Sequence, residues 1–293
     1  MSSTVTPDTS AAVEQVESRS VARQLGFGFW LSSAFVLLMV VLALLAPVLP
    51  IEDPSATAVG EQFEGPRPGL WFGADILGRD VFSITIWGSR ISLLVGFIAI
   101  VVGFVIGGPI GIVAGYFRGK FDQFVSFAFA TLLSFPALIL AILITTILGR
   151  TVFWVSISLG ILAIAPVGRL ARAQTLVFAE REFVTAARVL GASHLRILTR
   201  EIFPNVVIPM SALALLGMGI AIVAEGTLAF LGISVSGAQS WGNQIAEASS
   251  TRNLQEGPHA ALAPIGVVFL TVLSLNYAGD RLREVFDTKE LNF

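Results

Sequence analysis

The sequence predicts an all-α polytopic membrane protein with six transmembrane helices, an N-terminal span followed by a core of five. Three observations lead to this fold class. Hydrophobic residues make up 55% of the 293 residues, and the mean hydropathy is +0.82. Charged residues make up only 13%, against roughly 25% in soluble domains. The charges also cluster, and they leave apolar runs near the length of about 20 residues that a membrane-spanning helix needs.

The first two segments differ sharply in polarity. Residues 1–23 are polar and lack apolar periodicity, so we expect a disordered cytoplasmic tail. The apolar run 24–51 is far longer than the hydrophobic part of a secretory signal peptide, which is about 7–15 residues. It also lacks a small-residue cleavage site at its end. We therefore predict a retained first span, followed by an external loop at 52–90.

The remaining spans follow from the other apolar runs. The shortest run, 151–168, is separated from the preceding one only by Gly149 and Arg150, so these two helices should form a hairpin. A buried or re-entrant helix is the alternative for this short run. We expect 280–293 to be a cytoplasmic tail with a short amphipathic helix. The five predicted core spans, within 91–279, are 91–117, 123–149, 151–168, 202–224 and 257–279.

The charge distribution orients these spans in the membrane. With six spans and the N-terminus inside, the inner segments hold 13 of the 18 Lys and Arg residues. Because short cytoplasmic loops are enriched in Lys and Arg, we predict a multi-pass protein of the inner or plasma membrane. Both termini and the large basic loop 169–205 are then cytoplasmic.

The composition excludes several kinds of site. A net charge of −2 offers no basic face for nucleic acid. The absence of cysteine excludes disulfides and thiolate metal sites. The two histidines, His194 and His259, are too few and too far apart in the sequence for a histidine metal site.

Glycines recur every four residues in the second predicted span and share one helical face. Small residues at this spacing let membrane helices pack closely. We interpret this face as a packing surface, and Gly107 and Gly111 as candidates for a helix interface or the translocation path. The four glycines are Gly103, Gly107, Gly111 and Gly115.

The charged stretch 182–205 reads EFVTAARVLGASHLRILTREIFPN. Gly191 in its middle predicts a break between two short helices, and Pro204 predicts re-entry into the membrane. A flat patch of small residues among charges is typical of a helix that docks into another protein. A solvated basic loop without a partner is the alternative. Apolar residues at helical spacing flank the glycine, at Phe183, Ala187 and Leu190 and at Leu195, Leu198 and Ile202.

This stretch resembles the EAA loop of ABC importer permeases, with the pattern E-A-A, three residues, Gly, nine residues, then I-x-L-P. Ala186, Ala187, Gly191 and Pro204 stand at matching positions. Three residues depart from it: Thr185 replaces the Glu, Glu201 the Ile and Phe203 the Leu. Four further segments are similar, in the same order, to permeases of the DppC/OppC type, a peptide and nickel subgroup. They are FGADILGRDVFSITIWGSRISLLVG (72–96), AEGTLAFLGI (224–233), SWGNQIAEA (240–248) and GDRLREVFD (279–287).

The resemblance covers about residues 20–290 and implies a MetI-like five-helix core with alternating access driven by separate ATPase subunits. It implies di- or oligopeptide import, with nickel or another small solute as the alternative. The implied partners are a DppB/OppB-like second permease, one or two cytoplasmic ATPase subunits that bind the ATP and Mg, an extracytoplasmic substrate-binding protein and membrane lipid. The chain itself would hold no cofactor and no metal. The residues implied to couple to the ATPase are Thr185, Ala186, Ala187, Gly191, Ala192 and Pro204.

Several other residues are candidates for function. Glu225 follows a long uncharged run, and an acid at membrane depth is costly and usually functional. If the fifth span extends to about Phe230, Glu225 lies inside the bundle, where it could shape the translocation path or brace the partner. Asn276 could hydrogen-bond to a neighbouring helix. The remaining candidates are Asp75, Arg79 and Asp80, as an outer gate, a binding-protein docking surface or a local ion-pair network, and Trp71, Trp87 and Trp241, as interfacial anchors.

Catalytic signatures are missing from the sequence. There is no phosphate-binding G-x-x-x-x-G-K-[ST] loop, no H-E-x-x-H and no G-x-S-x-G. We therefore predict a non-catalytic subunit and disfavour a membrane-embedded enzyme. The other rival class, an ion-coupled secondary transporter, predicts inverted repeats and paired ionisable residues, and the sequence shows neither convincingly.

Overall fold

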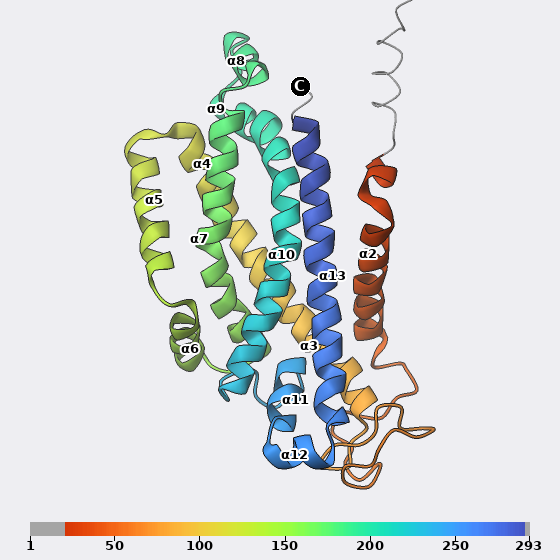
Figure 1. Cartoon of the computed structure of the whole chain (residues 1–293). Helices are drawn as coiled ribbons and strands as arrows, with labels where there is room; N and C mark the ends of the chain where they lie inside the picture. Colours follow the sequence, from red (N-terminus) through yellow and green to blue (C-terminus); the bar gives the residue numbers. More distant parts are fainter. Residues whose placement is uncertain (1–20, 291–293) are drawn as a thin grey trace, which may run out of the picture.

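The computed structural model of the chain describes residues 21–290 (Figure 1). Within this range the regular elements are all helices, apart from two isolated β-bridges between 67 and 80. The predicted all-α fold class is confirmed. Of the predicted N-terminal tail 1–23, only 21–23 fall inside the described range, where they belong to the first helix. Residues 291–293 of the predicted C-terminal tail also lie outside it.

Helix α2 (Val21–Leu45) is the N-terminal span. It packs along α13 (His259–Glu290) and against α3 (Val81–Val102) through Met39 and Ala43. Much of its remaining surface is exposed apolar side chain. Such a surface is expected of a helix that faces lipid or another membrane helix.

The second span is longer than its apolar run. Helix α3, the π-helical turn η1 (Gly103–Gly107) and α4 (Gly108–Phe117) form one continuous helix of 37 residues. It begins at Val81 rather than 91 because Asp80 caps it, accepting hydrogen bonds from the backbone N–H groups of Phe82 and Ser83. At about 55 Å the helix is longer than the ~30 Å hydrocarbon core, so it tilts in the membrane or extends beyond that core.

The third predicted span, 123–149, is broken. Helices α5 (Gly119–Ser134) and α6 (Ala137–Leu148) meet at 89°. Pro136 lies at the break and the preceding residue, Phe135, is extended. Proline explains both the break and the extended residue before it. Its nitrogen cannot donate a helical hydrogen bond, and its ring disfavours helical backbone in the preceding residue. Five helices in the described range are long and apolar enough to cross a membrane, or six if the bent pair counts as one.

Helix α7 (Val152–Phe178) follows α6 after a short turn and packs against it, as the predicted hairpin requires. It runs ten residues beyond the predicted end at 168 and takes in the charged residues Arg169 and Arg172. Arg172 makes a bidentate ion pair with Asp122, which holds α5 against α7. Arg169 and Arg172, which led us to end the predicted span at 168, therefore lie within α7.

After α7 come α8 (Glu182–Val189), the short α9 (His194–Arg196), the π-helical η2 (Ile197–Ile202) and α10 (Phe203–Phe230). From His194 to Phe230 the chain is one continuous helix of 37 residues. It thus extends past both ends of the predicted span 202–224. Pro204 does not end this helix, and it lies just after the π-helical turn η2.

Helices α11 (Trp241–Ala248) and α12 (Thr251–Glu256) precede α13 at the other end of the bundle (Figure 1). Together with the loop 46–80 they form a surface that we call the cap. Helix α13 continues without a break to Glu290, so the amphipathic helix predicted within 280–293 is instead the end of α13.

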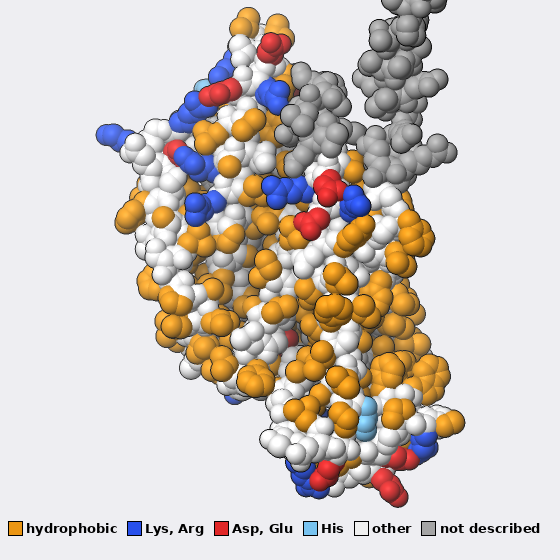
Figure 2. Space-filling view, in the orientation of Figure 1, with side chains coloured by type: hydrophobic (Ala, Val, Ile, Leu, Met, Phe, Trp, Pro, Cys, Tyr) orange, Lys and Arg blue, Asp and Glu red, His pale blue; other side chains and the backbone are white. Residues whose placement is uncertain are grey.

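The start of α2 and the end of α13 lie at the same end of the bundle as α8 (Figure 1). In Figure 2 basic side chains gather at that end, while the middle of the bundle is mainly apolar. This distribution agrees with the charge argument that puts the α8 end in the cytoplasm, an orientation that stays a prediction.

Candidate functional site

The α8 end of the bundle carries a projecting helix–turn–helix, which we call the elbow (182–196). Its turn is a hydrogen-bonded helix stop. The Ala192 N–H donates to the Ala187 carbonyl and the Gly191 N–H to the Arg188 carbonyl, both at 3.0 Å. Gly191 has φ of +78° and open space where a side chain would be, the backbone conformation that favours glycine at this position. The predicted break at Gly191 is therefore present.

One apolar residue fixes α8 to the bundle. Val184 is fully buried and packs in a cluster with Ile197 and Ile202. Of the three residues at helical spacing before the glycine, Phe183 and Leu190 are 38% and 86% exposed, and only Ala187 packs against the cluster. The side chain of α8 that points into the bundle is therefore Val184.

The predicted coupling residues within the elbow differ in exposure. Thr185, Ala186 and Gly191 are exposed, while Ala187 and Ala192 are half-buried. Next to them Val189 and Leu190 expose 83% and 86% of their surface. Pro204 is also exposed but lies farther along, in the first turn of α10. The elbow thus presents a small-residue surface with two prominent apolar side chains, and Pro204 lies outside it.

A polar contact that the sequence did not suggest joins the elbow to α4. The Tyr116 hydroxyl and His194 Nδ1 are 2.8 Å apart, and the Arg188 guanidinium lies over the Tyr116 ring at 5.4 Å from its centre. Tyr116 is one of two tyrosines in the chain and stands at the end of a predicted span. Its position at the end of a span could have suggested a functional role, but no sequence rule pairs it with His194, which lies 78 positions away.

The glycine face predicted in the second span lies against α7. A Cβ on Gly107 would come within 2.3 Å of the Ile164 carbonyl oxygen, and one on Gly111 within 2.1 Å of the Gly168 carbonyl oxygen. The two helices therefore touch backbone to backbone. Asn276 of α13 lies close to Gly219 of α10, whose Cβ would be 3.7 Å from the Asn276 amide oxygen.

Glu225 lies in α10, which extends to Phe230, and is fully buried. Its Oε1 accepts hydrogen bonds from the hydroxyls of Ser234 and Ser240, the latter at 2.7 Å. Ser240 is also the N-cap of α11, since its hydroxyl accepts the Asn243 N–H. One carboxylate oxygen thus fastens both ends of the connection between α10 and α11. The two serines were not singled out in the sequence.

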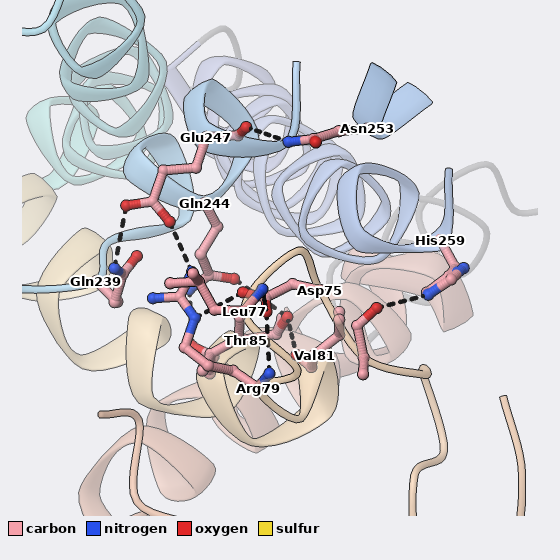
Figure 3. Close-up of polar contacts among 12 residues, drawn as sticks. Asp75, Leu77, Arg79, Val81, Thr85, Gln239, Gln244, Glu247, Asn253 and His259 are labelled. Carbon is pink, nitrogen blue, oxygen red and sulfur yellow. Dashed lines mark hydrogen bonds and ion pairs between the residues drawn. The ribbon is translucent and has the colours of Figure 1, made fainter. Parts of the chain in front are cut away.

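The acidic and basic residues before α3 form a buried network in the cap (Figure 3). Arg79 donates from Nε to Asp75 at 2.6 Å and from Nη2 to Glu247 of α11 at 2.7 Å. Burial lowers the pKa of Arg79, but hydrogen bonds and charge from Glu247 and Asp75 outweigh it, so the pKa lies above its ordinary value. Asp80 is the N-terminal capping residue of helix α3. This geometry is that of an ion-pair network, and it leaves Asp75, Arg79 and Asp80 little surface on which a partner could dock.

Helix α11 is attached to α3 by further hydrogen bonds. The Gln244 amide donates to the Ile84 carbonyl at 2.7 Å, and the Trp241 indole N–H donates to the Thr85 carbonyl at 2.9 Å. The prediction of Trp241 as an interfacial anchor is wrong, because its side chain is fully buried. Its ring fills the junction of α3, α10 and α13. Trp71, by contrast, is 68% exposed, and Trp87 is half-buried beside Arg90.

Comparison with known proteins gives three kinds of match. The family described as the binding-protein-dependent transport system inner membrane component matches residues 107–290. The dipeptide transport system permease protein DppC of Alkalihalophilus pseudofirmus is 35% identical over 254 residues, which cover 85% of this chain and 82% of that protein. The glutathione transport system permease protein GsiD of Pectobacterium atrosepticum is 36% identical over 260 residues, covering 87% and 85%.

Among solved structures, a chain of the inward-facing MetNI methionine ABC transporter matches with a TM-score of 0.57 and 19% identity. The match covers 69% of this chain and 96% of that one. At this identity the likeness concerns the fold, and it confirms the expected MetI-like arrangement of the core helices.

Proposed function

This chain belongs to the family of binding-protein-dependent transport system inner membrane components, and from that premise we propose that it is the import subunit for dipeptides and oligopeptides. At the coarser level it is a non-catalytic permease subunit of an ABC importer of the dipeptide and glutathione type. The related DppC favours short peptides as the solute. Glutathione is the second candidate, because GsiD is equally similar and its named solute is also a small peptide.

The elbow is the observation that supports the mechanism. A membrane subunit without its own ATP site needs a surface that receives force from another protein. The elbow projects from the bundle, its turn is fixed by two backbone hydrogen bonds, and Val189 and Leu190 are exposed beside Ala186 and Gly191. Apolar side chains on a projecting helix are typical anchors for a groove in a partner. In the proposed mechanism, a cytoplasmic ATPase subunit binds here and moves the elbow when it closes on ATP.

The remaining surfaces support the proposal for the other partners. Helix α5 exposes Phe124 and Phe127 at 68% and 71%, and α2 exposes Leu37 and Leu44 at 62% and 72%. These apolar faces support contact with a second, DppB/OppB-like permease and with lipid. The cap, at the opposite end from the elbow, is the proposed docking side for an extracytoplasmic binding protein. Localisation in the cell membrane with both termini inside completes the proposal.

The transport experiment uses the full complex. The chain is reconstituted in proteoliposomes together with its partner permease, its ATPases and its binding protein. Uptake of labelled dialanine, tetra-alanine, glutathione and a nickel chelate is then measured with and without ATP. We expect ATP-dependent uptake of dialanine. Uptake of glutathione alone or of nickel alone would replace the peptide assignment, and uptake without ATPases would indicate a secondary transporter.

The docking experiment uses the natural absence of cysteine in the chain. Ala187→Cys puts one thiol on the elbow, and Leu254→Cys puts one on α12 of the cap, where Leu254 is 49% exposed. Thiol-to-amine crosslinking of the assembled complex should join the ATPase to the Ala187 position and not to the Leu254 position. No crosslink from the elbow, or an equal yield from both positions, would contradict docking at the elbow.

A further inference from the structure

Beside Glu225 there is a cavity of about 320 Å³, lined by residues of α3, α10, α11 and α13. Glu225 contributes a carboxylate to its wall, while most of the other lining side chains are apolar. The cavity opens where Val223 and Phe230 of α10 are 49% and 65% exposed. Its size is at the lower end of the ~300–1,000 Å³ of small-molecule sites.

Only one of the two oxygens of the Glu225 carboxylate accepts hydrogen bonds from the surrounding protein. Oε1 of Glu225 holds the hydroxyls of Ser234 and Ser240. Oε2 is buried and has no hydrogen-bond partner anywhere in residues 21–290. A buried acceptor without a donor carries a desolvation cost. A neutral acceptor would be enough to fasten the two serines, and the second oxygen is left available to a donor in the cavity.

The geometry selects the kind of donor. A guanidinium binds carboxylates best through both oxygens at once, and Oε1 is already occupied. A metal ion needs several ligands, and no group of three or more His, Cys, Asp or Glu side chains suited to a metal occurs in the described part of the chain. A primary ammonium is a compact charge that can bind a single oxygen.

The other walls can satisfy the rest of an ammonium group. The hydroxyl of Thr227 lines the cavity and has an oxygen that can accept a hydrogen bond. Phe230 lines it with a largely exposed aromatic ring, and an ammonium over such a ring is stabilised by its negative face. Ser92 and Trp241 stand behind them, fully buried and joined by a hydrogen bond from the Trp241 backbone N–H to the Ser92 hydroxyl.

We propose that this cavity binds the α-ammonium group of the transported peptide during translocation, with Glu225 Oε2 as its acceptor. The inference rests on the proposed peptide function and adds a recognition site within the membrane part of the permease. The site would hold the amino-terminal end of a peptide and leave the rest in the path outside the cavity. The site would therefore accept peptides with different side chains and of different lengths.

The first test compares uptake by variants of the complete transporter at saturating binding protein. Glu225→Gln keeps an oxygen that can hold both serines but removes the charge and replaces the free oxygen with a donor. We expect dialanine uptake to fall about tenfold or more, the usual effect of losing a charged hydrogen bond. Glu284→Gln makes the same chemical change at an exposed position near the end of α13 and should leave uptake unchanged. Ser234→Ala removes one fastening bond and should lower uptake less than about twofold.

The second test leaves the chain unaltered, so that it does not depend on the folding of a variant. The wild-type transporter is treated with dicyclohexylcarbodiimide, which modifies carboxyl groups in apolar surroundings, and the label on Glu225 is measured by mass spectrometry. Dialanine present on both sides of the membrane should protect Glu225. N-acetyl-dialanine, which has no ammonium group, should not protect it.

Besides unchanged uptake by Glu225→Gln, four results would overturn the inference. They are equal protection by the two peptides, no protection by either, a loss in Ser234→Ala as large as in Glu225→Gln, and loss of the partner permease from the purified Glu225→Gln complex. The last would mean that a cation of the partner fills the cavity. If wild-type transporter takes up dialanine but Glu225→Gln does so equally well, only this inference fails. If the wild type takes up no peptide, the proposed function fails.

Discussion

Replacing Gly111 with alanine should force α4 and α7 apart. The new Cβ would lie 2.1 Å from the Gly168 carbonyl oxygen and 2.9 Å from its carbon, both backbone atoms that cannot rotate away. Ordinary contact begins at 3.4 Å, so the two helices must separate by about 1.3 Å at this point. Overpacking of this kind costs about 1–3 kcal/mol.

A matched control is available three residues earlier. Gly108 is also buried in the same helix, but its Cβ would meet only the Met210 methyl carbon, at an ordinary 3.7 Å. Both substitutions gain the same helix propensity, about 1 kcal/mol, so the difference between them reports the contact with α7 alone. For a chain of this size 1 kcal/mol corresponds to roughly 2–4 °C in Tm.

We therefore expect the Tm of Gly111→Ala to lie about 2–12 °C below that of Gly108→Ala. The assay is size-exclusion chromatography of the fluorescently tagged chain in detergent after heating to a series of temperatures. Equal Tm values for the two variants would show that α4 and α7 are not in backbone contact, and the interpretation of the glycine face would be wrong.

Three further predictions concern the elbow and the cap. Gly191→Glu should abolish ATP-driven uptake without lowering the amount of protein in the membrane, because it strains a positive-φ turn and charges the docking surface; uptake and immunoblots of membranes measure the two effects. Arg79→Met should lower the free energy of unfolding by about 3–5 kcal/mol, because it leaves the buried Asp75 carboxylate without its cation. Glu247→Gln, at a half-exposed position, should cost less than about 1 kcal/mol. The Tm values of the two variants measure both effects. Tyr116→Phe should lower the uptake per ATP hydrolysed, because it removes the hydrogen bond to His194 and keeps the ring; parallel uptake and phosphate-release assays give the ratio.

Each of these predictions has a result that contradicts it. Gly191→Asn tolerates positive φ better than other substitutions, so a loss of uptake equal to that of Gly191→Glu would point to strain instead of docking. If Arg79→Met melts at the wild-type temperature, the network contributes nothing to stability. An unchanged ratio of uptake to hydrolysis in Tyr116→Phe would exclude a coupling role for its hydroxyl.

The fold class and the elbow could be predicted because each depends on local sequence. Apolar runs identify spans regardless of how the helices pack, and Gly191 between two helical patterns marks a turn by its backbone freedom alone. Helix bounds were harder, since hydropathy stops at the first charge. Asp80 begins α3 ten residues before the apolar run, and Arg172 lies inside α7, where it pairs with Asp122.

The tertiary contacts could not be predicted, because their partners are far apart in the chain. Arg79 and Glu247 are separated by 168 residues, and Trp241 meets Thr85 across 156. A tryptophan near a span end is typical of the membrane interface, and only the packing of α11 on α3 puts Trp241 in the core instead. Pro136 could have predicted the bend between α5 and α6. The continuous hydropathy of 123–149 instead favoured one unbroken span.

The unbroken helix from His194 to Phe230 gives the molecule a lever. Its 37 residues span about 55 Å, with the elbow at one end and the Glu225 cavity near the other. A tilt of one degree about the elbow end would carry the far end sideways by about 1 Å. A small swing of the elbow would therefore be enough to widen or narrow the cavity near the other end of this helix.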